Sequence, residues 1–313
     1  MESLPESRLM TFLPDTLKNV RKIYDLDNVE KINESINILD DWVKKQNHFL
    51  MKEFPRDYLE RTIITCKGSV ERAKVRLERN CTLKTLLPKY FEKSNYRDDL
   101  RDVHTDGQIA VFPKLTKDYC RVVIARLFRN FPGGYLNFFR SNIILSEYML
   151  RHDYCAGFVV ILDYIDLPNI LDLVTTLNLI EMLYFLLQEG YGMRLKGLYI
   201  VSHSKMIEAL VMLVKQALSE KLHQRIHVVK TREAMTEYIA KEILPEEYGG
   251  NESSIVKLHR KYSKYLRILL SEEHIEYFKK MSRAATDESL RSRDQLASEY
   301  MGLPGTFRTL RVD

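Results

Sequence analysis

The amino-acid sequence predicts an α/β domain over about residues 96–250, preceded by a small all-helical domain over residues 1–95 and followed by a third segment over residues 251–313. Apolar residues recur at helical spacing up to about residue 88. Clusters of β-branched residues typical of strands begin only after the charged connector NYRDDLRD. Long helical patterns separate the last three clusters, which indicates parallel strands joined by right-handed crossovers.

The first 95 residues contain three amphipathic patterns. Asp27 and Glu30 have the spacing of a capping box and predict the start of the first long helix. Pro55 suits the first turn of a second helix, and a third runs from Gly68 to about Pro88. The apolar stripe of the first long helix consists of Ile32, Ile36, Leu39 and Val43.

Five strand-like clusters follow: QIAVF, CRVVIARL, GFVVILDYI, LKGLYIVS and RIHVVK. Helical patterns over residues 167–190 and 203–223 link the last three. After GGNESS, the segment SIVKLHRKYSKYLRILLSEEHIEYFKKM predicts a basic helix or pair of helices. From about Ser282 onward the sequence is polar, and we expect irregular structure.

The composition is that of a globular protein, with 45% hydrophobic and 29% charged residues. A net charge of +5 is small for a dedicated nucleic-acid-binding protein, so no nucleic-acid partner is expected. The four cysteines lack CxxC spacing, which predicts reduced thiols and no zinc site. The N-terminus lacks a signal-peptide pattern and acidic residues interrupt the apolar region 158–189, so we expect a cytoplasmic protein.

The sequence offers little support for catalysis. Neither GxGxxG nor GxxxxGK[ST] occurs at a strand-to-helix turn, and no cofactor is expected. Ser202, His203 and Ser204 follow a strand, and with Asp163 they raise the alternative of a hydrolase site. The GxSxG motif is missing, and adjacent strand residues point to opposite faces, so a helix cap formed by Ser202 or Ser204 is the favoured interpretation. We therefore expect no enzyme.

Several longer segments resemble a known family. VERAKVRLERNCTLKTLLPKYF resembles the end of the helical domain that precedes a CRAL-TRIO lipid-binding domain, and RIHVVKTREAMTEYIAKEILPEEYGG resembles the last strand, last helix and LPxEYGG closure of that domain. GFVVILD and YGMRLKGLYIVS lie between them in the same order. The closing MGLPGTFRTLRVD is similar to the tail of many insect members. Over about residues 20–313 the chain is thus identified as a member of the CRAL-TRIO (Sec14-like) family, nearest to alpha-tocopherol transfer protein-like members of insects.

The resemblance implies a mostly parallel sheet flanked by helices, with a hydrophobic pocket under a helical lid. It implies a monomeric carrier that binds one small hydrophobic molecule (a tocopherol, retinoid, carotenoid or other lipid) and transfers it between membranes, with transient membrane association. The alternative is an interaction module that acts in membrane traffic or small GTPase regulation without transporting a ligand. Both interpretations exclude catalysis.

The resemblance also assigns the wall of the pocket. Alternation along GFVVILD places three of its residues on one face, and the lid is the helix from Lys205 to about His223. The expected wall consists of Phe139, Asn142, Ser146, Phe158, Val160, Leu162, Met193, Leu195 and Leu198, and the expected lid residues are Ile207, Leu210, Val211 and Val214.

Four basic residues complete the expected site. Positions that hold phosphoinositide phosphates in tocopherol-transfer proteins correspond here to Arg194, Lys196, Lys221 and Arg225. Guanidinium and ammonium groups converging on phosphate form strong charge-assisted contacts. Without the resemblance, the same residues are interpreted as solvated cations, with Lys221 complementing a helix C-terminus.

Overall fold

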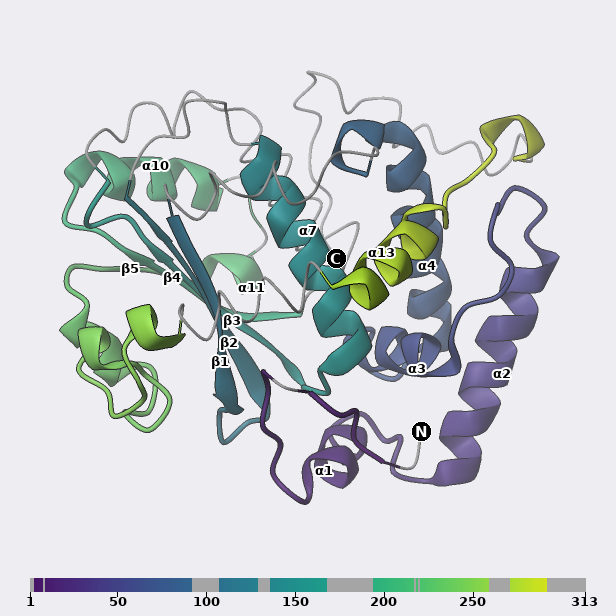
Figure 1. Ribbon diagram of the computed structural model, residues 1–313, viewed down its shortest axis with the longest axis horizontal. Helices are drawn as coiled ribbons and strands as arrows, with labels where there is room; N and C mark the ends of the chain where they lie inside the picture. Colours follow the sequence, from purple (N-terminus) through teal and green to yellow (C-terminus); the bar gives the residue numbers. More distant parts are fainter. Residues whose placement is uncertain are drawn as a thin grey trace.

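A computed structural model of the 313-residue chain describes residues 3–7, 9–91, 107–128, 136–167, 194–216, 218, 220–258 and 271–291. Figure 1 shows most helices of the N-terminal region on one side of the molecule and the β-sheet on the other, with α7 (Leu136–His152) and α13 (Glu272–Ser282) between them. Helix α7 thus lies between the β-sheet and the N-terminal helices.

The N-terminal region is helical, as predicted. Its elements are α1 (Thr16–Lys22), α2 (Val29–Lys45), α3 (Arg56–Thr65), α4 (Val70–Leu86) and the short 3-10 helix η1 (Pro88–Tyr90). The predicted apolar stripe of α2 is buried. The predicted capping box is wrong: Asn28, not Asp27, is the N-cap, and its side-chain oxygen accepts hydrogen bonds from the backbone N–H groups of Glu30 (2.8 Å) and Lys31 (3.1 Å).

The sheet contains the five predicted strands within the described residues, in the order β1-β2-β3-β4-β5. They are β1 (Gly107–Leu115), β2 (Cys120–Leu127), β3 (Gly157–Asp163), β4 (Leu195–Val201) and β5 (Ile226–Val229). β1 and β2 are antiparallel because only four residues join them, too few for a crossover, whereas the pairs β2-β3, β3-β4 and β4-β5 are parallel. The prediction of a mostly parallel sheet is confirmed.

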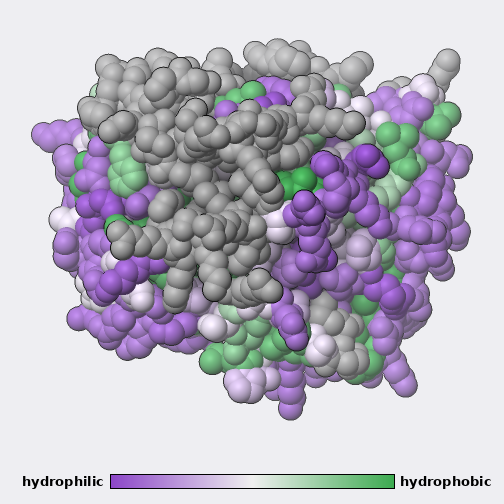
Figure 2. Space-filling model, viewed as in Figure 1, coloured by the Kyte–Doolittle hydropathy of each residue, from purple (hydrophilic) through white to green (hydrophobic). Residues whose placement is uncertain are grey.

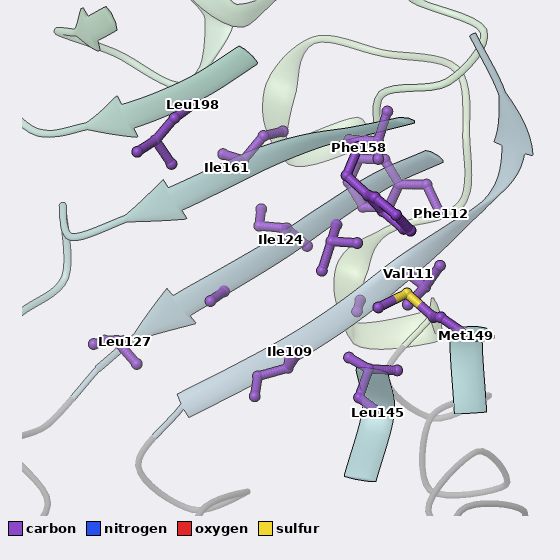
Figure 3. Packing of buried hydrophobic residues seen from close by; sticks show 14 of the residues in the cluster. Ile109, Val111, Phe112, Ile124, Leu127, Leu145, Met149, Phe158, Ile161 and Leu198 are labelled. Carbon is purple, nitrogen blue, oxygen red and sulfur yellow. The ribbon is translucent and has the colours of Figure 1, made fainter. Parts of the chain in front are cut away.

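Helix α7 packs on one face of this sheet. Figure 3 shows Leu145 and Met149 of α7 next to Ile109 and Val111 of β1, and all four belong to one buried cluster. The predicted helix over residues 167–190 lies outside the described residues except for its first residue.

The predicted single helix from Lys205 to His223 is instead two helices. They are α10 (Lys205–Gln216) and the short α11 (Glu220–His223). On the predicted cap, the Ser202 hydroxyl accepts a hydrogen bond from the backbone N–H of Ser204 just before α10 begins (3.2 Å).

The LPEEYGG segment closes the sheet domain through one buried tyrosine. It forms the 3-10 helix η4 (Glu246–Tyr248), which follows η3 (Glu233–Glu237). The Tyr248 hydroxyl donates to the carboxylate of Asp163 at the end of β3, and Arg232 donates to the same carboxylate (2.6 Å). Gly249 has φ +72°, and a Cβ atom at Gly250 would lie 1.9 Å from the backbone oxygen of Leu244. Both glycines are therefore required by the backbone geometry.

The described residues after α13 form no regular helix or strand apart from one short 3-10 helix, which agrees with the irregular structure predicted from Ser282. They contain the 3-10 helix η5 (Glu288–Leu290) and pack on α4. Thr85 of α4 donates to the Thr286 backbone oxygen (2.9 Å), and Arg291 donates to Glu78 and Thr82. Residues from about 292 onward lie outside the described residues.

Two buried apolar clusters form the interior. One joins the sheet, α7 and the LPEEYGG segment, and the other joins α1–α4 with Tyr154, Ala156, Met281 and Ala284. The second cluster thus draws on all three predicted segments, and their boundaries at residues 95 and 250 remain predictions.

Figure 2 shows that hydrophilic residues cover most of the described surface in this view, with smaller hydrophobic patches among them.

Candidate functional site

The predicted wall residues on the sheet share one face. The register pairs Val160 of β3 with Leu198 of β4, and Leu162 with Ile200. Although β3 lies inside the sheet, Val160 and Leu162 keep partial exposure, whereas Phe158, Leu195 and Leu198 are buried. Met193 lies outside the described residues. The assignment of these residues to a ligand pocket remains a prediction.

The predicted wall residues on α7 differ in what they contact. Phe139 is buried, with its ring centroid 6.2 Å from that of Tyr90. Asn142 is partly buried and its amide donates to the Phe138 backbone oxygen (2.8 Å). The Ser146 hydroxyl donates to the Asn142 backbone oxygen (2.8 Å). Both polar side chains therefore bond within the helix, as helix-interior Ser and Asn residues often do.

Among the predicted lid residues, Ile207 and Val211 of α10 are buried, and Leu210 and Val214 are partly exposed. The same helix exposes further apolar side chains to solvent: 42% of Met206, 61% of Met212 and 63% of Leu213. An amphipathic helix packed only on a core would bury such residues, so α10 carries apolar side chains on two sides.

One small cavity, of about 30 Å³, lies between α3, α7 and the start of β3. Ser146 and Phe158 line it, so the structure brings these two predicted wall residues together. The other predicted wall and lid residues are not among its described lining residues. Arg61 of α3 also lines it, and nothing in the sequence pattern of α3 marks this residue as buried.

The four predicted basic residues lie together at the N-terminal ends of β4 and β5. The Arg194 backbone oxygen accepts from Phe158 (2.8 Å), and the Arg225 backbone oxygen accepts from Leu198 (2.7 Å), so the sheet fixes both arginines. The Arg194 guanidinium lies over the ring of Tyr24, 4.8 Å from its centroid, and donates to its hydroxyl. Tyr24 belongs to the N-terminal helical region. The sequence pattern did not predict its contact with Arg194.

Lys196 extends across Gly157 of the neighbouring strand. A Cβ atom at Gly157 would lie 3.0 Å from Cγ of Lys196 and 2.8 Å from the Arg194 backbone oxygen, so only glycine leaves room for this path. Burial, followed by the charge of Arg194, lowers the pKa of Lys196, and the charge of Arg225 acts in the same direction. Arg194, Lys196 and Arg225 are therefore close enough to repel one another.

A fifth cation, Lys67, joins this group from the helical region. The α3 helix ends with Lys67 (φ +60°) and Gly68 (φ +77°) in the left-handed conformation, and the Gly68 N–H donates to the Ile63 backbone oxygen (2.9 Å). The adjacent Lys221 ammonium, followed by burial and the charges of Lys221 and Arg194, lowers the pKa of Lys67 to about 8. The turn therefore places Lys67 beside the four predicted cations.

These five residues form what we call the basic cluster: Lys67, Arg194, Lys196, Lys221 and Arg225. Within the described part of the chain, none of them has a carboxylate oxygen within 4.0 Å. Clustered cations without a carboxylate in direct contact raise the free energy of the free protein, and an anion that binds among them lowers it. The arrangement is suited to binding a phosphate group.

The alternative hydrolase site is not assembled. The Asp163 carboxylate contacts Arg232, Tyr248 and the Ile165 backbone N–H (3.0 Å), and the hydrogen bonds of the described residues include none between Asp163 and His203. Ser202 is buried, whereas His203 is exposed.

Two further observations concern metal and membrane binding. The described residues contain no group of three or more His, Cys, Asp or Glu side chains that could hold a metal ion. Among the helices that the structure describes, none has the length and apolar character needed to cross a bilayer.

Comparisons with known proteins agree with the resemblance. Residues 105–250 match the CRAL/TRIO domain family. The mouse protein alpha-tocopherol transfer protein-like is 25% identical over 222 residues, and its human and Sumatran orangutan (Pongo abelii) counterparts are 24% identical. Each alignment covers 69% of this chain, and the chain spans 64% of the length of these relatives.

Among solved structures, the crystal structure of Sfh5 matches with a TM-score of 0.49 and 13% identity, covering 80% of this chain and 92% of that one. The matching relatives named here are mammalian, and the expected likeness to insect members remains a prediction. The family match covers β1 to β5 and the LPEEYGG closure. The sheet and its closing segment, residues 105–250, are therefore similar to the CRAL/TRIO domain family.

Proposed function

We propose that this protein binds one small hydrophobic ligand and transfers it between membranes, and that its basic cluster recognises a phosphoinositide headgroup at the membrane. The observation that carries the proposal is the group of five cations with no carboxylate partner among the described residues. The CRAL/TRIO match supports lipid binding in general, and the relatives' names suggest a tocopherol-like ligand, although the ligand here could equally be a retinoid, carotenoid or other lipid. In this proposal the protein is a cytoplasmic monomer without enzymatic activity, related to the alpha-tocopherol transfer protein-like members of insects.

The neighbouring helix supports membrane contact. α10 contacts α11, which carries Lys221, and α10 exposes the apolar side chains of Met206, Met212 and Leu213. Apolar side chains beside cations are the combination that peripheral proteins use to bind anionic bilayers. The protein would thus associate with membranes transiently, through headgroup contacts and shallow insertion.

A double substitution tests the proposal. Each basic residue near an anionic surface contributes about 1 kcal/mol, so Arg194→Ala combined with Arg225→Ala should weaken binding to phosphoinositide vesicles by roughly tenfold to thirtyfold. Uptake of a fluorescent lipid from detergent should be unchanged, and its transfer to vesicles should slow. The measurements are vesicle co-sedimentation and a fluorescence transfer assay at two salt concentrations.

The matched control is the double variant Lys31→Ala and Lys45→Ala. It removes the same charge from exposed positions on α2, which Figure 1 shows on the side of the molecule opposite the sheet. If the control weakens vesicle binding as much as the cluster variant, the attraction comes from net charge alone. If neither variant changes binding or transfer, headgroup recognition by the cluster is refuted. Absence of any lipid uptake by the unmodified protein would refute the carrier function.

A further inference from the structure

The cavity between α3, α7 and β3 is lined by one guanidinium group that makes only part of its possible hydrogen bonds within the described residues. Arg61 of α3 lines it, and its side chain is only 5% exposed. One terminal nitrogen, Nη1, donates to a carboxylate oxygen of Asp57 (2.8 Å) and to the Leu150 backbone oxygen (2.7 Å). The other two nitrogens, Nε and Nη2, are buried and have no hydrogen-bond partner among the described residues. A buried donor without an acceptor is unfavourable and is uncommon in folded proteins.

The other polar side chains around the cavity are already bonded. The Thr65 hydroxyl donates to the Thr62 backbone oxygen (2.8 Å), and the Ser146 hydroxyl donates within α7. The Asp153 carboxylate accepts from Arg121 (2.9 and 2.8 Å), and the Tyr154 hydroxyl donates to Glu60 (2.7 Å). Among the described lining residues, Arg61 is therefore the one whose buried donors call for an acceptor.

The geometry of these donors selects the kind of acceptor. Nε and Nη2 lie on one edge of the planar guanidinium, and that edge matches the two oxygens of a carboxylate. The cavity volume of about 30 Å³ is enough for two water-sized groups, since one such group needs on the order of 10–15 Å³. Asp57 occupies only the Nη1 side of Arg61, and because its side chain is 37% exposed, solvent screens its charge.

We infer that Arg61 holds the carboxylate end of the hydrophobic ligand, so that the protein prefers long-chain carboxylic acids to the corresponding esters and alcohols. This inference rests on the proposed lipid-binding function. Ser146 and Phe158 belong both to this cavity and to the predicted pocket wall, so a chain anchored at Arg61 would lie against the sheet face that carries Val160 and Leu162. An ester or alcohol offers no pair of equivalent anionic oxygens to the guanidinium edge.

The test compares oleic acid, methyl oleate and oleyl alcohol as radiolabelled ligands of the purified full-length protein. Oleic acid should bind at least tenfold more tightly than methyl oleate. Arg61→Gln should reduce this ratio to about one while changing methyl oleate binding less than threefold. Thr65→Val, which alters the cavity wall but keeps its cation, should retain the preference. Asp57→Asn should increase the preference, because it removes a negative charge next to Arg61 that repels the carboxylate of the acid.

Each outcome decides a separate point. Equal binding of acid and ester by the unmodified protein, or an undiminished preference in Arg61→Gln, overturns the inference and leaves the carrier function intact. If none of the three ligands binds, the proposed function itself fails for this class of lipid. If Arg61→Gln does not fold, as judged by circular dichroism, Asp57→Asn decides: an unchanged or reduced preference for the acid overturns the inference.

Discussion

Removal of the Tyr248 hydroxyl should destabilise the sheet domain by a predictable amount. Tyr248 is fully buried, and its hydroxyl donates to the carboxylate of Asp163, which is also fully buried. Tyr248→Phe keeps the ring and deletes only this donor. A hydrogen bond to a charged group contributes about 1.5–3 kcal/mol. Because Asp163 retains Arg232 and the Ile165 N–H, we expect a loss near the lower end, about 1.5–2 kcal/mol.

The assay is thermal and urea unfolding followed by circular dichroism at pH 7. At an unfolding entropy of about 2.1 cal/mol/K per residue, a loss of this size lowers the midpoint of a 313-residue chain by roughly 2–3 °C. Tyr238→Phe is the matched control, because Tyr238 is 45% exposed and the hydrogen bonds of the described residues include none to its hydroxyl. Its ring contacts with Tyr199 and His227 remain in the phenylalanine variant. Equal midpoints for the two variants would refute the assigned role of the Tyr248–Asp163 bond.

Three further predictions concern uptake and pH. Val160→Asp should abolish uptake of a fluorescent lipid, because an unpaired carboxylate in an apolar pocket costs several kcal/mol. The control, Val75→Asp at an exposed position of α4, should leave uptake unchanged. Equal uptake by both variants would place Val160 outside the pocket. Binding of phosphoinositide vesicles should weaken between pH 7 and 9 in the unmodified protein, because the pKa of Lys67 is about 8 and a bound phosphate favours the protonated lysine. The weakening should be smaller in Lys67→Ala. Identical pH profiles for the two proteins would show that Lys67 is not part of the site. Burial lowers the pKa of His274 to about 4, below its usual 6.5. Between these pH values the native state binds fewer protons than the unfolded state. Up to about 3 kcal/mol of unfolding free energy should therefore be lost as the pH falls from 6.5 to 4. Urea unfolding should show a flatter pH dependence over that range in His274→Gln, and a parallel curve would contradict this cause.

The strands could be predicted because their signal is local. Each β-branched run is bounded by turn residues, and the four-residue link between β1 and β2 is too short for anything but an antiparallel pair. The α2 cap was misplaced by one residue because Asp27 and Asn28 are both good N-caps, and the choice depends on where the chain turns. Local pattern therefore gave the elements but not their exact ends.

The candidate site depended on contacts between distant elements. Arg61 is buried because α7 covers α3 on a side that an isolated amphipathic helix would expose, which no spacing within α3 can indicate. Lys67 reaches the basic cluster because of a left-handed helix end next to Gly68. The four other cations were found through the family resemblance, and their convergence depends on the register of β4 and β5.

The last described segment of the chain completes the interior of the first. Met281 and Ala284 belong to the buried cluster of α1–α4, the Lys84 ammonium donates to the Met281 backbone oxygen (2.8 Å), and Arg291 reaches Glu78. On the ribosome, α1–α4 emerge first, yet these contacts cannot form until residue 291 has been synthesised and has left the exit tunnel. The helical region is thus synthesised first but completes its packing late. Until residues 281–291 are available, part of its apolar surface stays uncovered.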